Sequence, residues 1–180
     1  MKLADTFEAL AYKQLVASDL PNRRSHQHEL TGVKTLNTIF GPGPKIEGRL
    51  KWVFFANADE PASEENAFTF YDARAKTAAR TGRSEWRLYY HGNFLNSADI
   101  GDLLIVAKTR SHDLLGMIFA KKSRAYKEAV NLFGLGPTIA FRSLSSEYME
   151  SRAWDVVDSR VFAPWFGISS KPRSKASPRE

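Results

Sequence analysis

Two segments of the sequence hold side chains that could contact a nucleic acid. The first, SDLPNRRSHQHE at residues 18–29, is polar almost throughout, and Pro21 and Asn22 break regular structure, so we expect a long exposed loop. Its guanidinium, imidazole, amide and hydroxyl groups are donors and acceptors of the kind that meet base edges and phosphates. The alternative interpretation is an ordinary solvated surface loop.

The second segment, DARAKTAARTGRSEWR at residues 72–87, is rich in arginine and has small residues between the charges. Arginines on a pliable segment can follow a phosphate backbone, and one guanidinium can take O6 and N7 of guanine together. A glutamate among them can orient an arginine or accept a hydrogen bond from cytosine N4. The alternative is an exposed helix stabilised by salt bridges. The segment's charged residues are Asp72, Arg74, Lys76, Arg80, Arg83, Glu85 and Arg87.

Recognised catalytic and metal-binding motifs are absent from the sequence. No lysine has Asp or Glu two residues before it, as many Mg²⁺-dependent nucleases require, and neither HExxH nor GxSxG occurs. His26 and His28 could share a strand face, but no third ligand is obvious nearby. We therefore expect no catalytic residue, no metal and no cofactor.

The charge of the chain favours a polyanionic partner. The formal net charge is +6; the last twelve residues hold four basic residues and Glu180, so they contribute +3 and the remainder +3. The chain has no cysteine, which fits a reducing cytosol, and its sequence shows neither a signal peptide nor an apolar run long enough to cross a membrane. We expect a cytoplasmic protein.

The elements that would position both segments are mostly short strands. Alternating or continuous apolar patterns predict strands at 12–17, 49–56, 67–72, 85–91, 102–108, 114–120 and 138–142. Helical spacing predicts helices at 3–10, 32–40, 123–134 and 145–157. An acidic turn is expected at 57–66. The pattern predicts an α+β, mainly β fold: a small barrel of about six to eight strands with peripheral helices, occupying residues 1–168, followed by a flexible basic tail at 169–180.

Several short motifs occur in an order found in a known family. They are Lys13-Gln14-Leu15, Asp19, the pair His26-Gln27, Tyr71-Asp72-Ala73-Arg74 and Arg83-Ser84-Glu85-Trp86-Arg87. Over residues 5–137 the chain resembles the N-terminal effector-binding domain of EcoRII-type restriction endonucleases. That domain belongs to the DNA-binding pseudobarrel group, which also includes the plant B-three transcription-factor domains.

The resemblance implies a pseudobarrel whose two arms clamp the major groove of a CCWGG-type site. Residues 18–28 would form the first arm and residues 74–87 the second. Arg83 and Arg87 would read guanines, and Glu85 would orient them or read cytosine. The residues expected to contact DNA are Lys13, Asp19, Asn22, Arg23, Arg24, Ser25, His26, Gln27, Arg74, Lys76, Arg80, Arg83, Glu85, Trp86 and Arg87.

The implied partners are double-stranded DNA and a separate catalytic nuclease domain beyond Glu180 in the full-length protein, and the isolated domain would be monomeric. The resemblance also implies a prokaryotic protein. This sequence differs from the family in having Pro21, Arg23 and Arg24 in its first arm and a second arm about two residues longer. Three alternatives stay open: a transcription-regulator-like DNA binder, a self-contained nuclease with a non-standard site, and an RNA-binding module.

Overall fold

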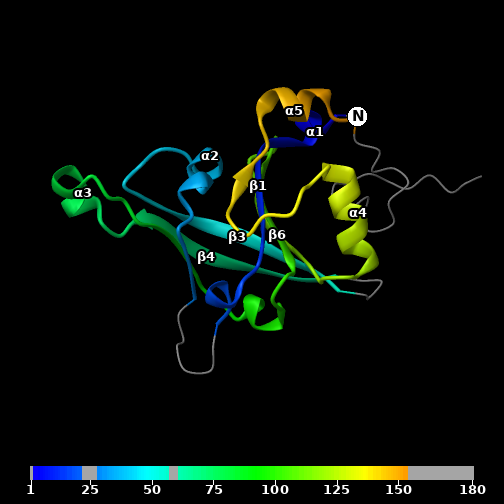
Figure 1. Ribbon diagram of the computed structural model, residues 1–180, viewed down its shortest axis with the longest axis horizontal. Coiled ribbons are helices and arrows are strands. Elements are labelled where there is room, and N and C mark those ends of the chain that lie inside the picture. The colour runs from blue at the N-terminus through cyan, green and yellow to red at the C-terminus, as the bar shows by residue number, and fades with distance from the viewer. Residues whose placement is uncertain (1, 22–27, 57–60, 154–180) are drawn as a thin grey trace, which may run out of the picture.

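One curled sheet dominates the computed structural model, which describes residues 2–21, 28–56 and 61–153. Its eight strands run in the order β2-β5-β4-β3-β7-β6-β1-β8 and form a half-barrel (Figure 1). Neighbouring strands are antiparallel except β3 and β7, which are parallel. The strands are β1 (Phe7–Gln14), β2 (Glu29–Thr31), β3 (Lys45–Phe55), β4 (Ala62–Asp72), β5 (Trp86–Tyr90), β6 (Leu103–Thr109), β7 (Leu114–Phe119) and β8 (Arg142–Ser143).

The helices are short and lie around the sheet. The α-helices are α1 (Leu3–Thr6), α2 (Asn37–Phe40), α3 (Ala75–Thr81), α4 (Arg124–Phe133) and α5 (Ser146–Ser151). Three 3₁₀ turns are η1 (Ala17–Asp19), η2 (Lys34–Leu36) and η3 (Phe94–Ser97). The predicted start of α4 is confirmed, because the Ser123 hydroxyl accepts a hydrogen bond from the backbone N–H of Tyr126 at 2.9 Å. The architecture is therefore α+β and mainly β.

The sheet has an apolar core on each side, and β3 contributes to both. Leu50 and Trp52 are buried in the curl, with side chains from β4, β5 and β6. Val53 and Phe55 belong to a second core on the other side, which α1, α4 and α5 help to enclose (Figure 1). The alternation that follows from the two-residue repeat of a strand thus lets one sheet bury both of its faces along β3.

The outer side of β2, β5 and β4 is instead polar and partly exposed. In β5, Leu88 and Tyr90 point into the core, whereas Arg87 and Tyr89 alternate to the other side. Thr31 of β2 lies opposite Arg87, and Glu29 lies opposite Tyr89. The same side of β4 carries Thr69 and Tyr71 next to these residues.

The first predicted helix was wrong beyond Thr6. Leu3, Phe7 and Leu10 fit a helical repeat, but Phe7 begins β1, where long-range pairing with β6 decides the conformation. The strand predicted at 12–17 accordingly starts earlier, at Phe7, and ends at Gln14. The predicted acidic turn also ends too late, because residues 62–66 already belong to β4 and pair with β3.

Other predicted element boundaries also differ from those in the structure. The helix predicted at 32–40 consists of η2 and α2, and β3 begins at Lys45 rather than at residue 49. The last strand is limited to Arg142–Ser143, and α5 ends at Ser151. The expected domain boundary at 168 and the tail at 169–180 lie outside the described residues.

Candidate nucleic-acid interface

The second arm leaves the sheet and returns to it at one hydrogen-bonded base. Asp72, the last residue of β4, accepts hydrogen bonds on Oδ1 from the backbone N–H of Arg74 at 2.9 Å and of Glu85 at 2.8 Å. The Ala73 N–H donates to the Glu85 carbonyl at 2.9 Å. Between these anchors the chain forms α3, which ends at Gly82 in the left-handed conformation (φ 64°). Most of this segment is thus a short helix held away from the body (Figure 1).

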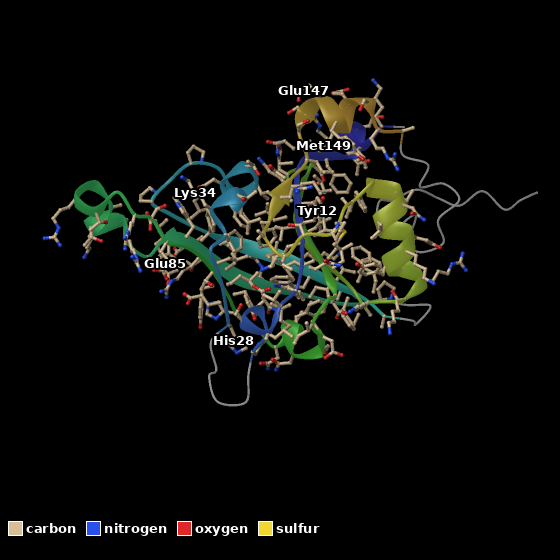
Figure 2. The ribbon with its side chains drawn as sticks, in the orientation of Figure 1. Tyr12, His28, Lys34, Glu85, Glu147 and Met149 are labelled. Atoms are coloured by element: carbon tan, nitrogen blue, oxygen red, sulfur yellow. The ribbon has the colours of Figure 1, made fainter. Side chains whose placement is uncertain are left out.

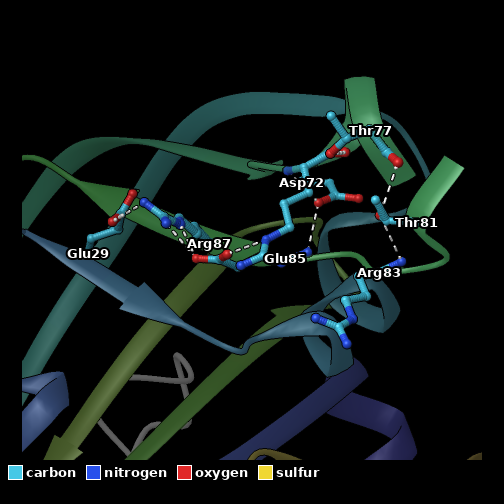
Figure 3. A network of polar contacts seen from close by, with 8 residues as sticks. Glu29, Asp72, Thr77, Thr81, Arg83, Glu85 and Arg87 are labelled. Carbon is cyan, nitrogen blue, oxygen red and sulfur yellow. Dashed lines mark hydrogen bonds and ion pairs between the residues drawn. The ribbon is translucent and has the colours of Figure 1, made fainter. Parts of the chain in front are cut away.

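The carboxylate of Glu85 lies between two arginines at this base. Arg74 Nε donates to Oε2 at 2.7 Å, and Arg87 donates to Oε1 from Nε at 2.9 Å and from Nη2 at 2.5 Å (Figure 3). The hydrogen bonds from Arg87, followed by that from Arg74, hold the pKa of Glu85 below its ordinary value. Glu85 therefore fixes both arginines and neutralises part of their charge.

Arg87 also contacts the strand that follows the first arm. Its Nη1 lies 3.1 Å from Glu29 Oε2, and the Tyr71 hydroxyl donates to Glu29 Oε1 at 2.9 Å. The hydrogen bond to Glu85 raises the pKa of Arg87, and burial followed by the bond to Glu29 raises the pKa of Tyr71. A continuous polar network, Arg74–Glu85–Arg87–Glu29–Tyr71, consequently ties β2, β4 and β5 to the base of the second arm.

The remaining cations of the second arm lie apart from this network. Among the described residues, no ion pair involves Lys76, Arg80 or Arg83. No dashed line joins the Arg83 guanidinium to Glu85 in Figure 3. An open recess of about 500 Å³ lies beside α3, lined by Arg74, Thr77, Arg80, Thr81 and Arg83. Its lining carries three positive groups and no carboxylate.

The start of the first arm is fixed by a buried ion pair. Lys13 Nζ lies 2.8 Å from Asp19 Oδ1 and 2.7 Å from Oδ2, and both residues are 5% exposed. Asp19 Oδ2 also accepts a hydrogen bond from the Val16 N–H at 2.8 Å. These contacts give Lys13 and Asp19 a structural role at the base of the arm.

The end of the first arm is fixed by β5. The Tyr90 N–H donates to the His28 carbonyl at 2.9 Å, and the rings of His28 and Tyr90 meet edge to face at 5.5 Å. The expected DNA contacts Asn22, Arg23, Arg24, Ser25, His26 and Gln27 lie outside the described residues.

The bases of the two arms stand at opposite ends of β5. Glu85 precedes this strand of five residues, and His28 is bonded to its last residue, Tyr90 (Figure 2). At about 3.4 Å per residue, the bases are roughly 17 Å apart. The expected contact Trp86 is half-buried and stacks on Phe70 with ring centroids 4.9 Å apart, so its contact is with the core.

Sequence reasoning missed two members of the network, Glu29 and Tyr71. Tyr71 was part of a motif noted in the sequence, but no role was assigned to it. The ion pair between Glu29 and Arg87 depends on the register of β2 against β5. Thr31 is paired with Arg87, and Glu29 lies two residues before Thr31 on the same face of β2. A three-residue strand carries too little pattern to reveal that register.

Comparison with models of known protein families and with curated protein sequences finds no match to this chain. Within residues 2–21, 28–56 and 61–153, no group of three His, Asp or Glu side chains is placed to hold a metal ion. In the same part of the chain, no helix has the length and apolar character needed to cross a membrane.

Proposed function

We propose that this protein is a pseudobarrel domain that recognises a short double-stranded DNA site with two arms. The observation that carries the proposal is the second arm, whose cations Lys76, Arg80 and Arg83 have no ion-pair partner among the described residues while its base is fixed by Glu85 and Arg87. An anchored arm with free guanidinium groups suits a polyanion, because its charge is available and its position is already ordered.

The spacing of the arm bases is compatible with a duplex as the ligand. The bases lie roughly 17 Å apart and the major groove of B-DNA is about 12 Å wide, so in the proposed complex the arms converge on the groove that they enter. The surface between the bases is the outer side of β2, β5 and β4, which presents the polar groups of Glu29, Arg87 and Tyr71.

The roles of the arginines in this proposal follow their contacts. Arg83 reads a guanine, whereas Lys76 and Arg80 contact phosphates. Arg87 was expected to read a base as well, but its guanidinium is occupied by Glu85 and Glu29, so we assign it to positioning. Lys13, Asp19 and Trp86 are not used as contacts, because each is engaged within the fold.

The proposed site is of the CCWGG type, and a separate catalytic domain would act on the bound DNA. Selection from a random duplex pool tests the first point. Enrichment of a CCWGG-type motif supports the proposal, enrichment of one different motif contradicts that site, and enrichment of no motif contradicts sequence-specific recognition. Competition with an RNA duplex of the selected sequence separates DNA from RNA binding, because A-form RNA has a different groove and carries 2′-hydroxyls.

Incubation of the purified chain with plasmid containing the selected site and Mg²⁺ tests the separation of binding and cleavage. We expect no cutting. Cleavage that co-purifies with the chain and scales with its concentration would assign a catalytic site to this domain and overturn that part of the proposal.

A further inference from the structure

The recess beside α3 is lined by three cations, Arg74, Arg80 and Arg83. Its donors are guanidinium groups alone, since both threonine hydroxyls are already used: Thr77 donates to the Arg74 carbonyl at 3.2 Å and Thr81 donates to the Thr77 carbonyl at 3.0 Å. The threonine hydroxyls therefore have no hydrogen left to donate, and side-chain hydrogen bonds to an anionic ligand must come from the arginines.

The recess is positively charged, in full from Arg80 and Arg83 and in part from Arg74, and suits an anionic group. Arg74 lies against Glu85, which offsets its charge, but only Arg74 Nε takes part in that bond. The terminal nitrogens of Arg74 remain able to donate. Arg80 has no ion pair among the described residues and adds one full positive charge. A phosphodiester carries one negative charge and oxygens that accept such hydrogen bonds.

We propose that this recess is a discrete binding site for one backbone phosphate of a nucleic-acid strand, held by Arg80 and the terminal nitrogens of Arg74. The site rests on the proposed function and refines it, because a phosphate held beside α3 would set the register of the arm. Arg83, which also lines the recess, would then contact a base edge.

The first experiment tests the recess without DNA. Inorganic phosphate is titrated into the full chain at constant ionic strength, and the arginine Nε–H signals are followed by NMR. We expect the signals of Arg74 and Arg80 to shift and the shift to vanish in Arg80→Gln. The matched control is Arg142→Gln on β8, which removes the same charge from an exposed position at the opposite edge of the sheet and leaves the shift intact.

The second experiment identifies the phosphate in a duplex. The selected site is prepared with a neutral methylphosphonate at one position at a time. At one position we expect the affinity of the unaltered chain to fall about tenfold, the loss of one charge-assisted hydrogen-bonded contact. In Arg80→Gln that substitution should change the affinity by less than about twofold, because the partner is already missing.

The outcomes distinguish a failure of the phosphate site from a failure of the proposed DNA recognition. Phosphate shifts together with one coupled duplex position support the inference. Shifts with no coupled position would mean that the recess takes a free phosphate, which overturns the backbone assignment. If neither is seen while Arg80→Gln still binds the selected duplex normally, the recess is not a phosphate site and the proposed DNA recognition stands. If no duplex is bound at all, the proposed function fails whatever the phosphate titration shows.

Discussion

Arg87 donates two hydrogen bonds to one carboxylate oxygen of Glu85, from Nε at 2.9 Å and from Nη2 at 2.5 Å. The remaining nitrogen of the same guanidinium lies 3.1 Å from Glu29. Glu85 stands at the base of the second arm and Glu29 directly follows the first arm, so one side chain connects the two. The geometry of both arms therefore depends on a residue that is itself fully engaged within the protein.

The Glu85 carboxyl should titrate below the ordinary glutamate range, and Arg87→Gln should raise its pKa. The reason is that hydrogen bonds from Arg87 stabilise the carboxylate form. Carboxyl ¹³C chemical shifts followed against pH measure this directly. An unchanged Glu85 pKa in Arg87→Gln would contradict the assigned contact.

The same network should make the free energy of unfolding depend on pH. Because the pKa of folded Glu85 is lower than that of the unfolded chain, its contribution is fully present above the unfolded value of about 4.5 and is lost as pH falls through the folded value. Urea unfolding between pH 7 and pH 3 should therefore show a smaller loss of stability in Glu85→Gln than in the unaltered protein.

The buried ion pair predicts a large effect on folding. Asp19→Ala leaves the Lys13 ammonium buried without its partner and should lower the free energy of unfolding by about 3–5 kcal/mol. The double variant Lys13→Met, Asp19→Asn should lose less, since no unpaired charge remains. Urea unfolding at pH 7 measures both. Asp19→Ala with full stability but no DNA binding would instead restore Asp19 as a direct contact.

Trp52 allows no side chain at position 116. A Cβ on Gly116 would lie 2.5 and 2.6 Å from ring atoms of Trp52, which is 0% exposed and packed into the core. Gly116→Ala should therefore destabilise the protein by about 1–3 kcal/mol through overpacking. Gly136→Ala is the matched control, because nothing lies within 4 Å of its added Cβ, and its effect should stay within about 0.5 kcal/mol.

Arg83 and Arg80 should differ in how they affect DNA binding. Arg83→Ala should cost about 1–3 kcal/mol on the selected site and reduce discrimination against altered sites. Arg80→Ala should weaken all sequences alike and reduce the slope of log affinity against log salt by about one. Fluorescence anisotropy at several salt concentrations gives both quantities. Equal losses on specific and random DNA for Arg83→Ala would remove its role in reading bases.

The sequence was informative where a local pattern alone decides the structure. Alternation over 85–91 predicted β5, and Ser123 with Gly134 bounded α4 correctly, because caps and strand periods depend on neighbouring residues. Phe7 shows the opposite case. Its spacing suited a helix, and only the distant β6 selects the strand.

The arrangement of the candidate site could not be predicted from the sequence. The sequence singled out the arginines of the second arm as a group. It could not separate Arg83, which has no ion pair among the described residues, from Arg87, which is bonded on both sides. That distinction depends on the register of β2 against β5 and of β4 against β5. Such register joins residues far apart along the chain and leaves no local signal.

The position of β1 in the sheet has a consequence for how the protein is made. In the described residues β1 pairs with β6 and β8, whose residues begin at Leu103 and Arg142. During synthesis, β1 therefore remains unpaired until the hairpin of β6 and β7 has been translated. Contacts of such long sequence separation slow folding, and the apolar side chains of β1 remain exposed to solvent until β6 is available.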